Sequence, residues 1–376
     1  MHILIIAPEQ IPVPPVKGGS VEICITNIAE RLAAKNQVTI VSRQHPEYPV
    51  IQETGNLKIV RVPAGKSPQQ YIQSAVNAVC RQSFDVIQID NRPKFVPVVR
   101  KAFPSTPISL FLHSLTFVKP ERLSPATARM CMKAANLIVT NSRSTCRKLQ
   151  KMFPSIRKKL ATVTLGVDAE MFRPATSEEK EQLRQKYKLP YGFTVLFAGR
   201  MIPRKGIPVL LKAADLARHK VPKLQVVLAG NGRKGYLQRL RRQVRKLRVP
   251  VIFSGYIPHQ CLPEWYRLAD CFACPSQKHE SFGLVNVEAM ASGLPVVASR
   301  NGGIKEIIRH FNNGWLVDDY KDPRAFAKGL IEIARNKKLA ERLSAQARKD
   351  AESRFHWDKT VRQLSNVYKS YFKLEG

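Results

Sequence analysis

Short apolar segments alternate along the whole chain with longer segments in which apolar residues recur every three or four positions. The first kind has the length of a buried strand, and the second has the period of an amphipathic helix. The predicted strands of the first half are 3–7, 38–42, 57–62, 86–90, 108–113, 137–140 and 161–165. Those of the second half are 194–200, 224–230, 249–255, 270–274 and 295–299. Strands that alternate with helices are typical of a parallel α/β sheet.

The series of strands begins anew after segment 165–176, LGVDAEMFRPAT, which leaves the last strand of the first half and carries a proline. A chain of 376 residues is also too long for one ordinary core. The pattern therefore predicts an α/β protein with one domain over 1–170 and a second over 171–354. Both domains are expected to be doubly wound and to face each other across a cleft. Ligands in such sheets bind at the carboxyl ends of the strands.

The last segment, 355–376, has the pattern of one more amphipathic helix. Five apolar residues lie on the stripe that we expect to be its buried face: Trp357, Val361, Leu364, Val367 and Tyr371.

Residues 280–288, ESFGLVNVE, follow the predicted strand 270–274 and carry two carboxylates around the start of a helix. The helix is predicted over 283–291. Gly293 and Pro295 follow it in the order that is typical of a helix end. Because a helix start has unpaired backbone N–H groups and a partial positive charge, this stretch is a candidate anion site.

Two residues of this stretch favour a phosphate and a sugar as its ligand. Gly283 lacks a Cβ atom, which lets a phosphate approach the backbone closely. Glu288 follows Leu284 by one helical turn, roughly 6 Å along the axis, and is placed to accept hydrogen bonds from ribose hydroxyls. The alternative for Glu288 taken alone is a solvated surface residue.

Loops after the first, fourth and fifth strands supply candidate residues in the first domain. Gly18 and Gly19 precede Ser20 and permit a tight turn into a helix, whose start is a second candidate anion site. The G-x-G-x-x-G spacing of a dinucleotide site is missing there, so NAD is not expected. Asp90–Pro93 and His113 fall at predicted strand ends. His113 either hydrogen-bonds a substrate hydroxyl or helps to stabilise charge, or it is a structural histidine bonded to nearby backbone.

Arg200 and Lys205 follow the first strand of the second domain. A guanidinium and an ammonium can converge there on a diphosphate. The chain has no D-x-D pair that would hold Mg²⁺ or Mn²⁺ against phosphates, so neutralisation by side chains and helix dipoles is expected instead of a metal. The pair Cys271 and Cys274 has the spacing of zinc ligands, but it lies inside a predicted buried strand without a second pair.

The chain has 62 Lys and Arg against 28 Asp and Glu, a net charge of +34, which favours polyanionic partners. The basic segment 232–249 carries an apolar stripe of four residues, so its arginines are expected to point into solvent: Leu237, Leu240, Val244 and Leu247. Nucleic acid is not expected, because no aromatic stacking platform accompanies the charge. Contact with an acidic membrane surface stays open.

Seven cysteines, an odd number, fit a reducing cytoplasm, and neither a signal peptide nor a membrane span is apparent.

Four stretches resemble family 4 of the retaining glycosyltransferases, in this order and spacing: FAGRMIPRKG, GYIPHQCLPEWYRLADCFACPS, HESFGLVNVEAMASGLPVVAS and NGGIKEII. In the first half, IPVPPVKGGS and NRPKFVP are similar to the glycosyltransferase-related proteins of bacillus spore coats, the spore coat protein SA group. The resemblance covers most of the chain. It implies the GT-B fold of two Rossmann-like domains, with the last helix crossing back to the first.

The resemblance also implies roles for matching residues. Glu288 corresponds to the glutamate expected on the donor ribose, and Glu280 to the one near the hydroxyls of the transferred sugar. Arg200 and Lys205 would neutralise the phosphates. Backbone groups of three further residues would touch the sugar and the diphosphate: Phe282, Gly283 and Leu284.

Other implied contacts come from loops. His113 matches the histidine beside the donor sugar, and Gly18 and Gly19 match the loop that faces the diphosphate. Tyr256 and Ile257 match a segment whose backbone meets the nucleobase.

The chain departs from the family pattern at two positions, both outside the predicted diphosphate site. Lys305 stands where a proline is common, and Leu165 where an asparagine is frequent.

The implied reaction is transfer of a sugar, with retention, from a nucleotide diphosphate sugar to an acceptor hydroxyl. No cofactor is expected, and UDP is favoured over GDP in the donor. Three kinds of acceptor are open: a saccharide, a lipid-linked molecule or an anionic polymer. The expected location is the cytoplasm, the inner membrane face or the spore coat. Two alternatives stay open, a non-catalytic coat or scaffold protein of this fold and a polyanion-binding protein.

Overall fold

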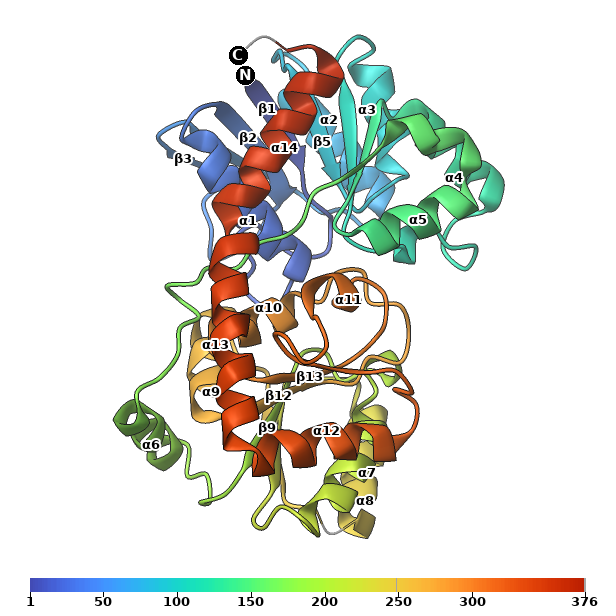
Figure 1. Ribbon diagram of the computed structural model, residues 1–376. Helices are drawn as coiled ribbons and strands as arrows, with labels where there is room; N and C mark the ends of the chain where they lie inside the picture. The colour runs from blue at the N-terminus through green and yellow to red at the C-terminus, as the bar shows by residue number, and fades with distance from the viewer. Residues whose placement is uncertain (248, 375–376) are drawn as a thin grey trace. The chain divides into compact units, whose positions relative to one another are not determined.

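The computed structural model describes residues 1–247 and 249–374 of the chain (Figure 1). Its contacts divide the chain into two compact units. One comprises Met1–Leu165 and the segment that begins at Trp357, and the other comprises Gly166–His356. The boundary between Leu165 and Gly166 lies inside the predicted joint 165–176. Arg248, near the end of the predicted basic segment, and positions 375–376 of the predicted terminal segment lie outside the described residues.

An eight-stranded sheet forms the centre of the first unit, with strand order β3-β4-β2-β1-β5-β6-β7-β8. Its strands are β1 (His2–Ile6), β2 (Gln37–Arg43), β3 (Ile51–Thr54), β4 (Leu57–Val62), β5 (Val86–Asp90), β6 (Ile108–Leu112), β7 (Leu137–Thr140) and β8 (Leu160–Thr162). All neighbours are parallel except β3, which pairs antiparallel with β4. The hydrophobic pattern does not predict β3, because this edge strand is largely exposed and carries no apolar run.

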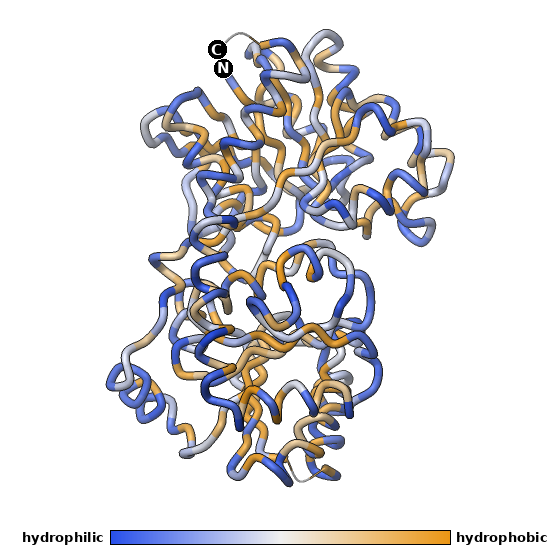
Figure 2. The backbone as a smooth tube through the Cα atoms, viewed as in Figure 1, coloured by the Kyte–Doolittle hydropathy of each residue, from blue (hydrophilic) through white to orange (hydrophobic). Residues whose placement is uncertain are grey.

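Helices pack on both sides of this sheet, because successive residues of a strand face opposite layers. Leu4 and Ile6 of β1 share a core with three helices, α2 (Pro68–Val79), α3 (Phe95–Ala102) and α4 (Pro125–Ala134). The other elements are α1 (Ser20–Ala33), α5 (Arg143–Met152), α14 (Trp357–Phe372), and the 3-10 helices η1 (Thr116–Val118) and η2 (Pro154–Lys159). Figure 2 shows apolar residues concentrated on the strands, whereas the helices carry both polar and apolar residues.

The C-terminal helix α14 belongs to the first unit and packs against α1 (Figure 1). The predicted buried stripe is wrong in part. The buried residues of α14 are Trp357, Thr360, Leu364 and Tyr368, whereas Val361 and Val367 are half-buried and Tyr371 is 40% exposed. The prediction counted only apolar residues. The observed buried face is shifted from the predicted stripe, because the polar residues Thr360 and Tyr368 pack inward. Tyr368 makes a buried hydrogen bond there.

A six-stranded parallel sheet forms the centre of the second unit, with strand order β11-β10-β9-β12-β13-β14. Its strands are β9 (Thr194–Ala198), β10 (Gln225–Ala229), β11 (Val251–Gly255), β12 (Cys271–Cys274), β13 (Val296–Ser299) and β14 (Trp315–Val317). The pattern does not predict β14, whose three residues are too few to show a period. With this sheet, the predicted doubly wound α/β class is confirmed for both units.

The helices of the second unit are α6 (Ser177–Lys186), α7 (Ile207–Arg218), α8 (Lys234–Leu247), α9 (Leu262–Leu268), α10 (Leu284–Ala291), α11 (Ile304–Ile307), α12 (Pro323–Arg335) and α13 (Lys337–Arg354), with the 3-10 helices η3 (Pro203–Lys205) and η4 (His259–Cys261). The predicted stripe of the basic helix α8 is confirmed: Leu240 is buried, and Leu237, Val244 and Leu247 pack partly buried against the core. None of the helices in the described part of the chain is long and apolar enough to cross a bilayer.

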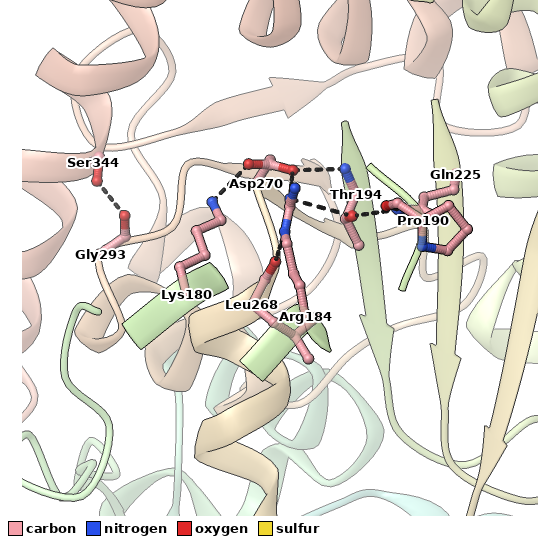
Figure 3. Close-up of polar contacts among 9 residues, drawn as sticks. All are labelled: Lys180, Arg184, Pro190, Thr194, Gln225, Leu268, Asp270, Gly293 and Ser344. Atoms are coloured by element: carbon pink, nitrogen blue, oxygen red, sulfur yellow. Dashed lines mark hydrogen bonds and ion pairs between the residues drawn. The ribbon is translucent and has the colours of Figure 1, made fainter. Parts of the chain in front are cut away.

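Asp270 ties the start of β12 to the neighbouring elements of the second unit (Figure 3). Its carboxylate lies 2.6 Å from Lys180 Nζ and 2.5 Å from Arg184 Nη2, both on α6. It also accepts a hydrogen bond of 2.7 Å from the backbone N–H of Thr194 on β9. Because Asp270 stands before β12 and Thr194 begins β9, this cluster holds the amino-terminal edge of the sheet and leaves the carboxyl edge to the loops that carry the candidate site.

Candidate active site

The loop between β12 and α10 forms the centre of the site in the second unit. Gly283 has a φ angle of 100°, in the left-handed region, and caps α10, which begins at Leu284, one residue after the predicted start. A side chain at this position would be strained, and its Cβ atom would lie 2.6 Å from Asn286 Nδ2. The glycine therefore permits the left-handed turn that opens α10, and the first backbone N–H groups of such a helix are donors of the kind that bind an anion.

Glu280 is held in this loop by two side chains. Its Oε2 atom lies 2.6 Å from Lys205 Nζ and accepts a 3.0 Å hydrogen bond from Ser276 Oγ. Burial raises the pKa of the Glu280 carboxyl, but the charge and hydrogen bond of Lys205 outweigh it and hold the pKa below its ordinary value. The structure thus pairs Lys205 with Glu280, a contact that the sequence pattern does not predict because the two residues lie 75 positions apart.

Glu288 is only 3% exposed, so the alternative of a solvated surface residue is wrong. Tyr266 Oη of α9 donates to its Oε2 atom over 2.9 Å, and His259 Nε2 of η4 lies 3.3 Å from its Oε1 atom. Burial lowers the pKa of His259, but the hydrogen bond and charge of Glu288 outweigh it and raise the pKa above its ordinary value. The ring of Phe172 packs edge-on against Tyr266 with centroids 5.6 Å apart. Glu288 is therefore a fixed hydrogen-bond acceptor.

The sequence motifs do not single out His259 and Tyr266 as site residues. The signal was weak: both lie within the quoted stretch GYIPHQCLPEWYRLAD, where a histidine follows a proline and a tyrosine interrupts a short apolar helix.

The remaining predicted residues of the second unit lie at the carboxyl ends of β9, β11 and β12. Arg200 follows β9 and is exposed, and Tyr256 follows β11 and is 40% exposed. Ile257 and Leu284 are half-buried, whereas Phe282 is buried. Because β9 and β12 are adjacent in the sheet, Arg200 and the loop before α10 lie at one edge, as the sequence predicts.

Gly18 and Gly19 have φ angles of 67° and 90°, and α1 begins directly after them at Ser20. The space above Gly19 is filled by Glu22, since a Cβ atom at Gly19 would lie 2.5 Å from Glu22 Oε2. Burial raises the pKa of Glu22 to about 7, although the charges of His113 and Arg92 oppose that rise. The predicted second anion site is thus lined by a carboxyl group that the sequence analysis missed, because an acidic residue in a first helical turn is commonplace.

His113 follows β6 and is 8% exposed. Its Nε2 atom lies 2.7 Å from Asp90 Oδ1 at the end of β5, and its ring stacks on Phe111 with centroids 4.4 Å apart. Its backbone carbonyl accepts a 3.0 Å hydrogen bond from Asn141 Nδ2, so both the ring and the main chain are held. Next to Asp90, Arg92 makes a bidentate pair with Glu9, at 2.6 and 3.2 Å.

Cys271 and Cys274 lie in the buried strand β12, and burial raises the pKa of both thiols, which disfavours the thiolate form that binds a metal. Within residues 1–247 and 249–374, no group of three or more His, Cys, Asp or Glu side chains is arranged to hold a metal ion.

Residues 18–171 match the family described as Glycosyltransferase Family 4, and residues 179–350 match the one described as Glycosyl transferases group 1. Spore coat protein SA of Bacillus subtilis (strain 168) is 30% identical over 379 residues, which cover 98% of this chain and 99% of that protein. The chain belongs to the group 1 and family 4 glycosyltransferases.

Two further proteins are similar to this glycosyltransferase along nearly their whole length. A D-inositol 3-phosphate glycosyltransferase of Thermomonospora curvata is 29% identical over 395 residues, which cover 93% of this chain and 90% of that protein. The solved structure of HepE from Anabaena in complex with UDP-glucose has a TM-score of 0.82 at 22% identity, covering 98% of this chain and 100% of that one. The fold of this glycosyltransferase is therefore GT-B, as the sequence predicts.

Proposed function

We propose that this glycosyltransferase transfers a sugar from a nucleotide diphosphate sugar to an acceptor hydroxyl, with retention at the anomeric carbon and without a metal. The observation that carries this proposal is the fixed carboxylate of Glu288, one turn into the helix that starts after Gly283. The helix start suits the diphosphate, and the carboxylate suits two neighbouring hydroxyls of a ribose.

Three groups of the second unit are assigned to neutralise the negative charge of the leaving diphosphate. Arg200 and Lys205 are cationic, and the first turn of α10 carries a partial positive charge. Donors placed where charge develops typically contribute about 3–4 kcal/mol each to transition-state stabilisation. Backbone groups of Phe282 and Leu284 complete the contacts to the phosphates and sugar.

Retention is proposed to proceed by front-face attack, with the departing phosphate helping to take the proton of the acceptor. Glu280 is engaged by Lys205 and Ser276, which supports a role in binding sugar hydroxyls rather than nucleophilic attack on the anomeric carbon. In the first unit, Gly18 and Gly19 are assigned to diphosphate contacts and His113 to a substrate hydroxyl.

UDP is the proposed nucleotide, with its base against the backbone of Tyr256 and Ile257. Support comes from the HepE structure, which holds UDP-glucose. An anionic acceptor is favoured by the net charge of +34 and by the D-inositol 3-phosphate named for the Thermomonospora relative. A saccharide or lipid-linked acceptor, at the cytoplasmic membrane face or the spore coat, belongs to the same proposal.

A screen of UDP-, GDP- and ADP-sugars, read by release of free nucleotide in the presence of inositol phosphates and oligosaccharides, tests this function. We expect turnover with a UDP-sugar, unaffected by a metal chelator, and an α-linked product from an α-linked donor. Turnover that is abolished by chelator would overturn the metal-free mechanism, and an inverted product would overturn retention.

A non-catalytic coat protein is the second candidate, because the Bacillus subtilis relative is called a spore coat protein. Thermal-shift titration separates the two. Saturating donor at 100 times its Kd should stabilise an enzyme by about 2.7 kcal/mol. No stabilisation by any donor, together with no turnover, favours the coat protein.

A further inference from the structure

A chain of buried polar side chains connects the C-terminal helix with His113 inside the first unit. Tyr368 Oη of α14 donates to Gln88 Oε1 over 2.6 Å, and Gln88 Nε2 donates to Asp90 Oδ2 over 2.7 Å. Asp90 Oδ1 lies 2.7 Å from His113 Nε2. Tyr368, Gln88 and Asp90 are fully buried, so each contact is made away from water. Breaking such a contact costs more free energy than breaking a surface hydrogen bond, because it leaves an unpaired buried polar group.

Strand alternation brings these residues together. Gln88 and Asp90 are alternate residues of β5, and Phe111 pairs with Asp90 on the neighbouring strand β6. The residues that alternate with them, Ile87 and Ile89, face the core shared with α2 and α3. The polar set therefore lies on the opposite face, where Tyr368 of α14 reaches it.

The direction of the hydrogen bonds determines which nitrogen of His113 carries the proton. Burial raises the pKa of Tyr368, so its phenol stays protonated and donates. Gln88 accepts through its oxygen and must turn its NH₂ group to Asp90. A carboxylate only accepts, so Nε2 of His113 donates to Asp90, and a neutral ring then presents a lone pair at Nδ1.

That Nδ1 atom is buried and has no hydrogen-bond partner among residues 1–247 and 249–374. Buried side-chain polar atoms are paired in the large majority of cases, so an unpaired acceptor on a fixed ring points to a ligand that donates a hydrogen bond. A sugar hydroxyl is such a donor, whereas a phosphate or carboxylate oxygen is not.

We propose that Asp90 is a positioning residue that holds His113 with its Nδ1 lone pair toward a substrate hydroxyl, and that Gln88 and Tyr368 extend this control to the C-terminal helix. The identity of the ligand as a sugar rests on the proposed function. The hydrogen-bond order itself does not, so the two can be tested separately.

The first test is ¹⁵N NMR of imidazole-labelled protein without substrate, about two pH units above the ordinary histidine pKa of roughly 6.5. The variant His113→Gln assigns the signal. Wild-type His113 should carry its proton on Nε2. The side chain of Asp90→Asn has only one oxygen for the two donors Gln88 Nε2 and His113 Nε2. When that oxygen accepts from Gln88, the asparagine NH₂ group faces His113 Nε2, so the Nδ1–H form of His113 should become populated. Thermal unfolding checks that each variant is folded.

Tyr368→Phe removes only a hydroxyl, and Tyr371→Phe on the same helix is its matched control, because the Tyr371 side chain is 40% exposed and outside the chain of contacts. We expect a shifted or broadened His113 signal in Tyr368→Phe and an unchanged one in Tyr371→Phe. In sugar transfer, kcat should fall about 10²-fold for Asp90→Asn with the donor KM nearly unchanged, as for a lost hydrogen-bonding group in the transition state.

A proton on Nδ1 in the wild type, or the same tautomer in Asp90→Asn, overturns the positioning role. Equal spectra of Tyr368→Phe and Tyr371→Phe overturn the link to the C-terminal helix. Absence of wild-type turnover with every donor counts against the proposed function alone, since the NMR measurement needs no substrate.

Discussion

Replacing Lys205 with methionine tests the ion pair in the loop before α10. The Lys205 and Glu280 side chains are 15% and 14% exposed, with 2.6 Å between Nζ and Oε2. Removing one partner of a buried pair costs about 3–5 kcal/mol, because the other charge is left unpaired. Ser276 Oγ still donates to Glu280, and a hydrogen bond to a charged group is worth about 1.5–3 kcal/mol. We therefore expect the free energy of unfolding to fall by about 2 kcal/mol at neutral pH.

The loss should depend on pH, and its sign follows from Glu280. In the wild type the pKa of this carboxyl is lowered, so its contribution to stability is complete above the ordinary value of 4.5 and is lost as the pH falls through the folded-state pKa. Without Lys205, burial raises the pKa, so the carboxyl destabilises the variant above its ordinary pKa and this cost disappears on acidification. The difference between the two proteins should therefore shrink as the pH falls from neutral toward about 4.

Urea unfolding across this pH range measures the effect, and Lys220→Met, at an exposed lysine, is the matched control. The double variant Lys205→Met/Glu280→Gln should regain most of the lost stability, because no unpaired charge remains. It should not regain turnover, which we expect to fall at least about 10²-fold in both variants if Lys205 stabilises the leaving diphosphate. A change in stability below about 0.5 kcal/mol for Lys205→Met would refute the reasoning about the ion pair. Near wild-type turnover would refute the catalytic role of Lys205.

Two other side chains give predictions of the same kind. The pKa of Glu22 is raised to about 7 from 4.5, so its contribution to stability is complete below 4.5 and is lost as the pH rises toward 7. Glu22→Gln should remove that dependence and stabilise the protein by up to about 3 kcal/mol at pH ~8, measured by urea unfolding; an unchanged pH profile would contradict the buried carboxyl. Tyr266→Phe removes the hydroxyl that orients Glu288 and should weaken binding of UDP about five- to tenfold in calorimetry, at a net value of about 1 kcal/mol per hydrogen bond. Tyr187→Phe, whose hydroxyl contacts Glu264, should bind UDP normally, and equal affinities of the two variants would argue against this role of Tyr266.

The elements that the sequence determined are those whose signals are local. The apolar run at 270–274 predicts β12, and the order Gly283, periodic residues, Gly293 predicts the limits of α10 within a residue. These predictions succeed because a strand period, a helix start and a helix stop depend on neighbours a few positions apart. The family assignment also follows from local motifs, which survive in order along the chain.

The pairings inside the site were decided only by the tertiary structure. Lys205 meets Glu280 across 75 positions, and Tyr368 meets Gln88 across 280. The choice of partner depends on which strands are neighbours in the sheet and on which face each side chain leaves it, and neither is a property of a short window. The same reason explains why the buried face of α14 differs from the predicted apolar stripe. That face includes Tyr368, whose hydrogen-bond partner Gln88 lies on β5 and is not visible in the sequence of the helix.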